Sequence, residues 1–445
     1  MAVRFHDIDH YMSNRSGYTL LPFRFMRWHD GAVLLVNEVG EYQFVSGELL
    51  RALVSHSLLR TNPSYSDLKA KHFLIDGSSV VPLELLATKY RTKKSFLDGF
   101  TKLHLFVVTL RCDHSCPYCQ VSRVSMERSR FDMSRETAER AVDLTFQSPA
   151  PDIKIEFQGG EPLLNFDLIR FIVEYSKQKN RDAKKNIEYV IASNLAYLSD
   201  DMLRFMKEHS ILLSTSLDGP EFVHNANRPR PNNNSYSLTI ANIDRARNLL
   251  GSDRVSALMT TTTLSLGYPR EIIDEYIKQG FTSIFLRSIS PYGFALRSKA
   301  TSGYQTSDFI SFYKTGLDHI IELNRRGVNF TEVYAQLLLT KILTPFATGY
   351  VDLQSPAGAG ISVVAYNYDG DIYASDEARM LAETGDTSFR LGNLHKNTYA
   401  ELFGGPILQT LVERSCNESL PGCSECAFQC YCGEIPCSIR QLRGT

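Results

Sequence analysis

Three cysteines follow an apolar run in the first third of the chain. The run covers residues 103–110, and Cys112, Cys116 and Cys119 come directly after it with the spacing Cys-x3-Cys-x2-Cys. Thiolate is the ligand that iron–sulfur clusters take from proteins. Three thiolates leave one iron of a four-iron cluster without a protein ligand. The spacing therefore predicts a cluster with one iron open to a non-protein ligand.

A second group of cysteines lies near the end of the chain. Six of the nine cysteines fall between Cys416 and Cys437, and residues 120–415 contain none. A disulfide framework is typical of small secreted chains, and neither a small size nor an apolar signal segment is visible in this sequence. Two tight groups favour two metal sites, and a mixture of buried thiols with one zinc site is the alternative.

The cysteine loop needs elements that position it, and strand and helix patterns alternate after it. Ser134 is a predicted N-cap of a helix over residues 134–147. Strands alternating with helices predict a parallel α/β architecture, in which the chemistry lies at the carboxyl ends of the strands. The six predicted strand runs end at Leu110, Phe157 and Ser193 and continue at residues 211–217, 255–263 and 283–289.

The first part of the chain has a different pattern. Strand-like runs at residues 32–36 and 41–45, followed by short helical stretches, predict a small winged-helix-like module. The strand edge of such a module could receive an extended peptide, although a packing cap on the main domain is the alternative. Residues 85–100 are a polar, basic connector. The predicted domains are 1–95, this module; 96–305, the α/β domain; 306–349, a helical linker; and 350–445, a cysteine-rich region.

Composition and charge limit the class of function. The 445 residues carry 48 basic and 49 acidic side chains, a net charge of −1. This balance gives no case for nucleic acid or a membrane surface as partner. No apolar run approaches the roughly 20 residues that span a bilayer. The expectation is a cytoplasmic enzyme.

A glycine-rich turn follows the second predicted strand. It reads Gln-Gly-Gly-Glu-Pro at residues 158–162; Gly159 and Gly160 would let backbone approach a ligand, and Glu161 could bind an ammonium group. Together with the cysteine loop, this turn resembles the radical S-adenosylmethionine (SAM) superfamily. The resemblance implies a partial (β/α)6 barrel in which SAM chelates the open iron. One electron from the cluster then cleaves SAM to a 5′-deoxyadenosyl radical, which abstracts hydrogen from the substrate.

The same resemblance implies further SAM contacts at the strand ends. Ser193 and Asn194 would contact the ribose, Ser216 the SAM carboxylate, and Tyr118 would pack near the adenine. Arg228 is either a second carboxylate contact or a surface salt bridge. Zinc is the rival of the cluster, with His114 completing a Cys3His set.

The last part of the chain resembles the SPASM extension of peptide-modifying members. Ser355 and Ser375 stand where that pattern has cysteines, which implies that its first auxiliary cluster is absent. The second set is intact as Cys423, Cys426 and Cys432. Its fourth ligand would be Cys416, Cys430 or Cys437, and a structural zinc stays an alternative for this site.

Asp376 follows Ser375 directly. In anaerobic sulfatase maturases, which this stretch resembles, an aspartate after that cysteine serves as a base near the substrate. The same residues could equally be the salt-bridged start of a helix.

A wider resemblance covers nearly the whole chain. It is to the radical SAM maturases (HxsB-type) of His-Xaa-Ser peptide systems, and it implies a ribosomally made precursor as substrate and a leader-binding N-terminal module. Partners would be an external electron donor such as flavodoxin or ferredoxin, and a companion radical SAM enzyme with small accessory proteins. Formylglycine formation on a sulfatase and a non-enzymatic zinc scaffold that binds peptide are the alternatives. The matching stretches are residues 21–25, 37–42, 108–112, 156–162, 290–295 and 373–379.

Overall fold

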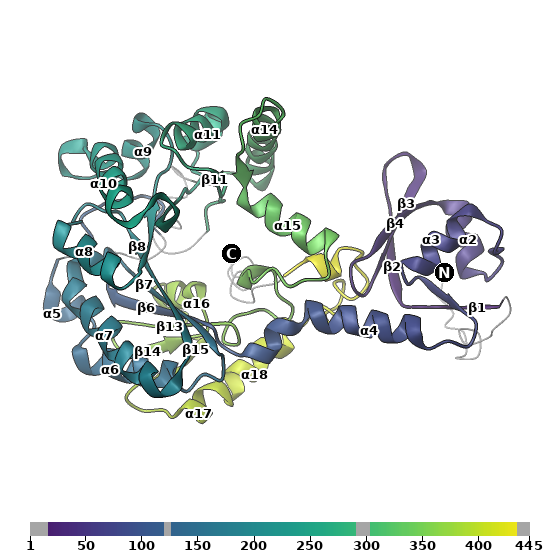
Figure 1. Cartoon of the computed structure of the whole chain (residues 1–445), viewed down its shortest axis with the longest axis horizontal. Coiled ribbons are helices and arrows are strands. Elements are labelled where there is room, and N and C mark those ends of the chain that lie inside the picture. The colour runs from purple at the N-terminus through teal and green to yellow at the C-terminus, as the bar shows by residue number, and fades with distance from the viewer. Residues whose placement is uncertain (1–16, 120–125, 291–302, 434–445) are drawn as a thin grey trace. The chain divides into compact units, whose positions relative to one another are not determined.

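The computed structural model describes residues 17–119, 126–290 and 303–433 (Figure 1). The chain forms two compact units, each assembled from distant segments. The barrel unit contains residues 99–336 and 358–413, and the terminal unit contains residues up to 98 with 337–357 and 414–434. The segment predicted at 350–445 is thus shared between both units, so the four predicted domains do not map onto them one to one.

The barrel unit contains an eight-stranded, mostly parallel sheet with the order β10-β9-β8-β7-β6-β13-β14-β15. Five of the six predicted strands lie next to one another in it. The sixth, β11 (Ser283–Ile284), pairs instead with the short strand β12 (Thr331–Glu332). The five parallel strands are β6 (Leu103–Thr109), β7 (Asp152–Gly159), β8 (Asn186–Ser193), β9 (Leu212–Ser216) and β10 (Val255–Leu258).

Strands from the last quarter of the chain complete this sheet on the far side of β6. β13 (Val363–Tyr366) pairs with β6 in parallel, and β14 (Asp371–Tyr373) and β15 (Arg390–Asn393) follow in antiparallel order. Part of the segment predicted as a cysteine-rich extension therefore forms strands of the α/β domain.

The two faces of the sheet differ in polarity because side chains alternate along a strand. Ile153, Ile155 and Phe157 of β7 are buried in the main hydrophobic core under the outer helices. Glu156 and Gln158 point to the other face and are partly exposed. The barrel thus has an apolar outer wall and a polar interior, with the helices around the strands in Figure 1. The helices are α5 (Arg128–Phe131), α6 (Arg135–Thr145), α7 (Phe166–Ala183), α8 (Asp200–Glu208), α9 (Glu221–Asn227), α10 (Ser235–Leu250), α11 (Pro269–Lys278), α14 (Thr306–Arg325), α16 (Asp376–Ala382), α17 (Tyr399–Phe403) and α18 (Pro406–Glu413).

Of two predicted helical segments, the structure shows the first as predicted and the second in two parts. Ser134 caps α6 as predicted, because its hydroxyl accepts a 3.1 Å hydrogen bond from the Thr137 N–H. The stretch predicted as one helical linker at 306–349 is interrupted: β12 separates α14 from α15 (Val333–Leu343). Phe312 and Ile320 of α14 are buried, whereas Ile321 is exposed.

The terminal unit is built on a three-stranded antiparallel sheet of β2 (Phe23–Arg27), β3 (Ala32–Asn37) and β4 (Tyr42–Ser46). The strands predicted at 32–36 and 41–45 are confirmed. The segment predicted at 85–100 as a basic connector largely belongs to the helix α4 (Val81–Lys93). The remaining elements are β1 (Tyr18–Leu20), β5 (Leu74–Asp76), α2 (Gly47–Val54), α3 (Pro63–Ala70) and α4 (Val81–Lys93).

The two faces of this small sheet are covered by different segments. Val33 and Leu35 of β3 pack into a core with the helices. Leu34 and Val36 point the other way and pack against Ala427 and Tyr431 of the cysteine-rich segment. The N-terminal strands and the described part of the cysteine-rich segment therefore belong to one folded unit.

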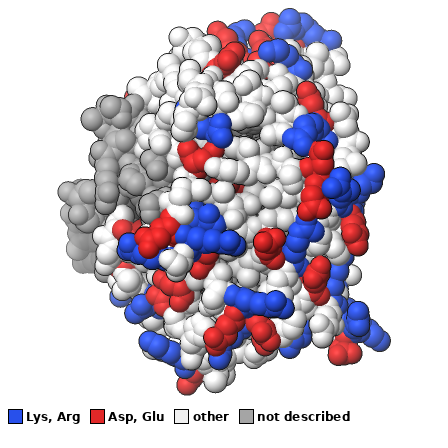
Figure 2. Space-filling view, turned by 90° about the vertical axis from the view of Figure 1, so that its left-hand side faces the viewer, with Lys and Arg blue, Asp and Glu red and all other residues white. Residues whose placement is uncertain are grey.

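The surface agrees with the balanced composition. Lys and Arg are interspersed with Asp and Glu on the face of the barrel unit in Figure 2. Among the residues that the structure describes, no helix combines the length and apolarity that a membrane crossing requires.

Candidate functional site

The cysteine loop begins at the carboxyl end of β6 and is held there by buried charges. Arg111 donates hydrogen bonds of 2.7 and 2.8 Å to the two carboxylate oxygens of Asp132 and another of 2.8 Å to the Leu164 carbonyl. The Thr109 hydroxyl adds a 2.6 Å bond to Asp132. These contacts fix the backbone immediately before Cys112.

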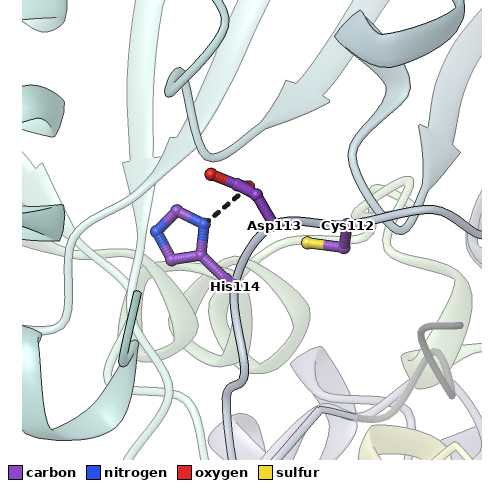
Figure 3. Close-up of side chains that lie close together, drawn as sticks. All are labelled: Cys112, Asp113 and His114. Atoms are coloured by element: carbon purple, nitrogen blue, oxygen red, sulfur yellow. Dashed lines mark hydrogen bonds and ion pairs between the residues drawn. The ribbon is translucent and has the colours of Figure 1, made fainter. Parts of the chain in front are cut away.

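Cys112, Asp113 and His114 place one ligand atom each within 4.8 Å of one another (Figure 3). Both ring nitrogens of His114 have partners, since Nδ1 lies 2.9 Å from Asp113 and Nε2 lies 2.8 Å from the Ser235 hydroxyl. A tetrahedral zinc site would bring thiolates to about 3.8 Å from one another, from Zn–S bonds of about 2.3 Å. Among the described residues, no three cysteine sulfurs gather within 4.8 Å. His114, the fourth member of the Cys3His alternative, already uses both ring nitrogens in these contacts.

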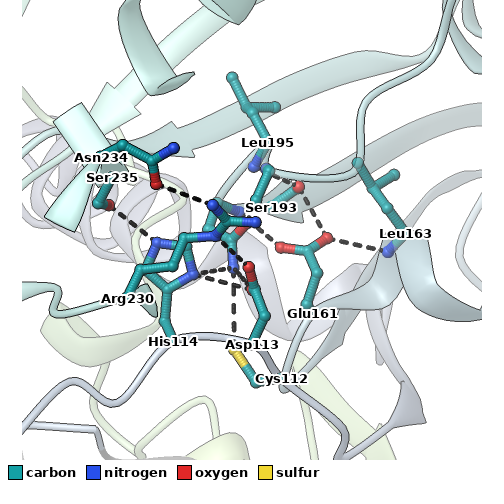
Figure 4. A network of polar contacts seen from close by, with 12 residues as sticks. Cys112, Asp113, His114, Glu161, Leu163, Ser193, Leu195, Arg230, Asn234 and Ser235 are labelled. Carbon is teal, nitrogen blue, oxygen red and sulfur yellow. Dashed lines mark hydrogen bonds and ion pairs between the residues drawn. The ribbon is translucent and has the colours of Figure 1, made fainter. Parts of the chain in front are cut away.

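Asp113 is a charged anchor that the sequence analysis did not single out. Burial raises the pKa of its carboxyl group, but hydrogen bonds from His114 and Arg230 outweigh burial and lower the pKa to about 2. The Arg230 contact is 2.6 Å long. Figure 4 shows Asp113, His114 and Arg230 in one network with Cys112. An ionised Asp113 ties the loop to the segment after α9.

The Gly-Gly turn touches the cysteine loop directly. A Cβ on Gly159 would lie 2.1 Å from the Thr109 carbonyl oxygen, and a Cβ on Gly160 would lie 2.3 Å from that of Arg111. No side chain fits at either position without moving backbone. These glycines are thus required for packing against the loop, whether or not they also approach a ligand.

Glu161 connects three strand ends. Its side chain is fully buried and accepts hydrogen bonds of 2.8 to 2.9 Å from the Leu163 N–H, the Ser193 hydroxyl and the Asn194 N–H. The amide of Asn194 lies 3.8 Å from the Cys112 sulfur. Burial raises the pKa of Glu161 to about 7. The structure thus brings together Cys112, Glu161, Ser193 and Asn194, all four predicted for the site.

A second buried cluster forms around Asp218, whose side chain is inaccessible to solvent. The Tyr118 hydroxyl donates a 2.6 Å hydrogen bond to it, and Arg228 makes an ion pair of 3.0 Å with it. The Arg228 guanidinium also lies over the Tyr118 ring, 5.4 Å from its centre. Arg228 does form a salt bridge, but in the interior rather than at the surface. Asp218 directly follows the strand run predicted at residues 211–217, and that position is its only sequence signal.

The remaining predicted residues of the barrel unit lie elsewhere. Ser216 ends β9 opposite Leu258 of β10 and is half-buried. Asp376 begins α16, where Ser375 is the N-cap, and it pairs with the buried Arg379 at 2.9 Å. The salt-bridged helix start is therefore what the structure shows at Asp376. Glu156, inside the barrel, was not predicted; burial raises the pKa of its carboxyl group, and the charge of Asp376 adds to this.

The C-terminal cysteines belong to the terminal unit. Cys416, Cys423, Cys426, Cys430 and Cys432 are described, and Cys437 lies outside the described residues, as does most of the predicted match at 290–295. Ser355 uses its hydroxyl to donate a 2.7 Å bond to Glu418 and to accept one of 2.9 Å from the Asn417 N–H. Both serines at the expected cysteine positions, 355 and 375, thus serve as polar anchors.

Comparison with known proteins supports this site. Residues 106–280 match the family model described as the radical SAM superfamily. The chain is 32% identical over 197 residues to an uncharacterized protein of Methanocaldococcus jannaschii, across 44% of this chain and 65% of that protein, so it spans somewhat less than two thirds of that relative.

Two further similarities extend beyond the matched domain. A cysteine-type anaerobic sulfatase-maturating enzyme of Clostridium novyi is 22% identical over 334 residues, covering 72% of this chain and 83% of that enzyme. The structure of Streptococcus suis SuiB bound to precursor peptide SuiA superposes with a TM-score of 0.55 at 14% identity, covering 94% of both chains. At this identity the second similarity shows the fold alone.

The donor set fits the cofactors of the matched family, a [4Fe–4S] cluster and SAM. Three cysteines at one strand end offer thiolates, and the carboxylate of Glu161 lies at the neighbouring strand end. Residues 106–280 therefore match a radical SAM domain, and the residues at these strand ends fit the two cofactors that the matched family uses.

Proposed function

We propose that this enzyme is a peptide maturase that modifies a ribosomally made precursor of the His-Xaa-Ser repeat type. Cys112, Cys116 and Cys119 would hold the catalytic cluster. Bound together, cluster and SAM supply a carbon-centred radical that abstracts hydrogen from the substrate. One observation carries the proposal: Cys112, Glu161 and Asn194, from the ends of three adjacent strands, converge in one buried network.

The residues of this network have distinct proposed roles. Glu161 would bind the ammonium group of SAM, and the donors around it orient its carboxylate. Ser193 and Asn194 would contact the ribose, and Ser216 the carboxylate of SAM. Arg228, already paired with Asp218, would orient Tyr118 rather than bind SAM by itself.

The terminal unit supports a peptide as substrate. Its three-stranded sheet has β2 and β4 as edge strands, and an edge strand presents backbone groups that an extended peptide can pair with. We propose a winged-helix-like, leader-binding role for it. SuiB, which has a similar fold over 94% of its length, is a protein solved with a bound precursor peptide. We further propose one auxiliary iron–sulfur centre on the C-terminal cysteines.

Formylglycine formation on a sulfatase is the second candidate, because a sulfatase-maturating enzyme is among the relatives. In that reaction Asp376 would be the base near the substrate. Asp376 begins α16 and forms an ion pair with Arg379 there. Mass spectrometry after co-expression separates the two candidates: a changed repeat-bearing precursor supports the first, and a changed sulfatase-derived peptide the second.

The radical chemistry itself is tested with anaerobically reconstituted protein, dithionite and SAM. We expect 5′-deoxyadenosine from the wild type and none from the triple variant Cys112→Ala, Cys116→Ala, Cys119→Ala. Asp201→Asn, which removes one carboxylate from an exposed ion pair away from all cysteines, is the control and should still form it. Formation by the triple variant would refute the assignment of the three cysteines.

A further inference from the structure

The terminal unit contains a hollow that the proposed SAM site does not use. It is lined by side chains from α4, from α15 and the segment after it, and from the cysteine-rich segment. Its charged and sulfur-bearing lining residues are Glu38, Lys93, Lys94, Lys341, Glu418, Cys430 and Cys432. Three ammonium groups and two thiols thus face one cavity.

Two of these lysines have no carboxylate partner among the described residues. Lys94 forms an ion pair with Glu418. Lys93 instead donates a 2.8 Å hydrogen bond to the Lys341 carbonyl, and Lys341 donates to the carbonyl of Leu353. Both side chains are half-buried. Glu38 and Glu418 also line the hollow, so its lining carries three positive and two negative groups. An anionic group in the cavity would balance the excess positive charge near the two lysines.

The thiol of Cys430 faces the same point as the Lys93 ammonium. The position that a Cβ would take on Gly40 lies 3.3 Å from the Cys430 sulfur and 3.2 Å from Lys93 Nζ. A bound metal ion replaces the proton of a thiol and leaves a thiolate, so a thiolate-ligated centre at Cys430 would supply negative charge beside Lys93.

The two kinds of lining group distinguish between possible occupants of the hollow. A small free anion would explain the lysines but not the two thiols. An iron–sulfur centre explains both, since its thiolate complexes are net negative.

We propose that Cys430 is a ligand of the auxiliary iron–sulfur centre and that Lys93 and Lys341 compensate the charge of this centre. The inference rests on the auxiliary centre of the proposed function. Reduction adds one electron from a low-potential donor and breaks no bond, so the centre becomes more negative by one charge. The two ammonium groups favour the reduced form and raise the midpoint potential. Lys93 and Lys341 are positioning residues, since they act through the centre.

The ligand is tested in the full chain with Cys112→Ala, Cys116→Ala and Cys119→Ala, which removes the catalytic cluster. After anaerobic reconstitution with iron and sulfide, this variant should retain one brown centre. Adding Cys430→Ala should remove most of its iron, whereas Cys416→Ala, whose thiol contacts Glu418 at 3.3 Å, should not. Full iron in the Cys430→Ala protein, or a colourless zinc protein, would overturn the assignment.

The lysines are tested by potentiometric titration on the same background. Lys93→Met with Lys341→Met should lower the midpoint potential of the centre, and Lys93→Arg with Lys341→Arg should restore it. Loss of iron from the methionine variant alone would also support the charge role of the lysines. Loss of iron from both the methionine and the arginine variants would overturn that role. An unchanged midpoint potential in a methionine variant with full iron would overturn it as well. None of these measurements requires SAM, so they fail independently of the 5′-deoxyadenosine assay.

Discussion

The two cysteine-bearing regions of this chain differ in whether their charged side chains are paired with opposite charges. In the barrel unit the charges around the cysteine loop are paired: Arg111 with Asp132, Arg230 with Asp113, and Arg228 with Asp218. In the terminal unit, Lys93 and Lys341 face the cysteines without carboxylate partners among the described residues. The side chains of the first region hold its cysteine loop in place by themselves. In the second region, we expect the order of the cysteines to depend on the group that they bind.

The largest effect should come from breaking a pair in the barrel unit. Asp218→Asn leaves the buried Arg228 without its counter-charge, and removing one partner of a buried pair costs about 3–5 kcal/mol. Chemical denaturation should show this loss. Asp201→Asn removes a carboxylate from an exposed pair with Arg170 and should change stability little. Equal effects of the two substitutions would contradict the view that the buried pairs order the site.

The contact between the glycine turn and the cysteine loop should be nearly as sensitive. Gly160→Ala forces its Cβ against the Arg111 carbonyl and displaces the loop, and a displacement of about 1 Å lowers rates by about 100-fold. We expect that loss in 5′-deoxyadenosine formation. Gly267→Ala, where nothing lies within 4 Å, is the matched control. Normal formation by Gly160→Ala would show that the loop tolerates movement.

In the terminal unit, Gly40 joins the β3–β4 turn to the cysteine-rich segment. Its φ of +80° disfavours a side chain, and a Cβ would lie 2.8 Å from the Tyr431 ring. Gly31 has a similar φ of +75° and open space. Backbone strain should lower the free energy of unfolding of both alanine variants by about 1–2 kcal/mol. Overpacking against Tyr431 should lower that of Gly40→Ala by about 1–3 kcal/mol more.

Trp28, the only tryptophan of the chain, provides the fluorescence signal for this comparison, since its ring lies 6.3 Å from that of Phe428 in the cysteine-rich segment. Equal losses in the two variants would show that the segment is not anchored at this turn.

The smallest predicted effect is a pH dependence of SAM binding. Because burial raises the pKa of Glu161 to about 7, most of this carboxyl group is protonated at pH 6 and ionised at pH 8. If the carboxylate binds the ammonium group of SAM, affinity should rise about tenfold over this range, which follows from the ionised fraction. Calorimetric titration at both values measures it, and Glu161→Gln should bind weakly at both. A flat profile in the wild type would argue against this contact.

The raised pKa of Glu161 has the opposite effect on folding stability, which decreases as pH rises. Its folded pKa lies above the ordinary 4.5, so the unfolded chain releases the proton first as pH rises. The contribution of Glu161 to stability in the SAM-free protein therefore falls between pH 4.5 and 7 and is constant above that range.

Local patterns predicted the barrel strands well because each carries its own apolar repeat. The run before Cys112 became β6, and Ser134 capped α6 as its position implied. The pairing of β11 was missed, since a two-residue strand has no periodicity to read. The helix α4 was missed because its polar, basic residues resemble a connector.

The sequence by itself determined the spacing of the three cysteines, the Gly-Gly-Glu turn and the alternation of strands and helices, because these depend on residues close together in the chain. The tertiary structure decided that Asp218, 100 residues after Tyr118, is the group that Tyr118 contacts. It also decided that the segment around Cys430 folds with β3. Both depend on packing between distant segments, and local periodicity carries no information about such pairings.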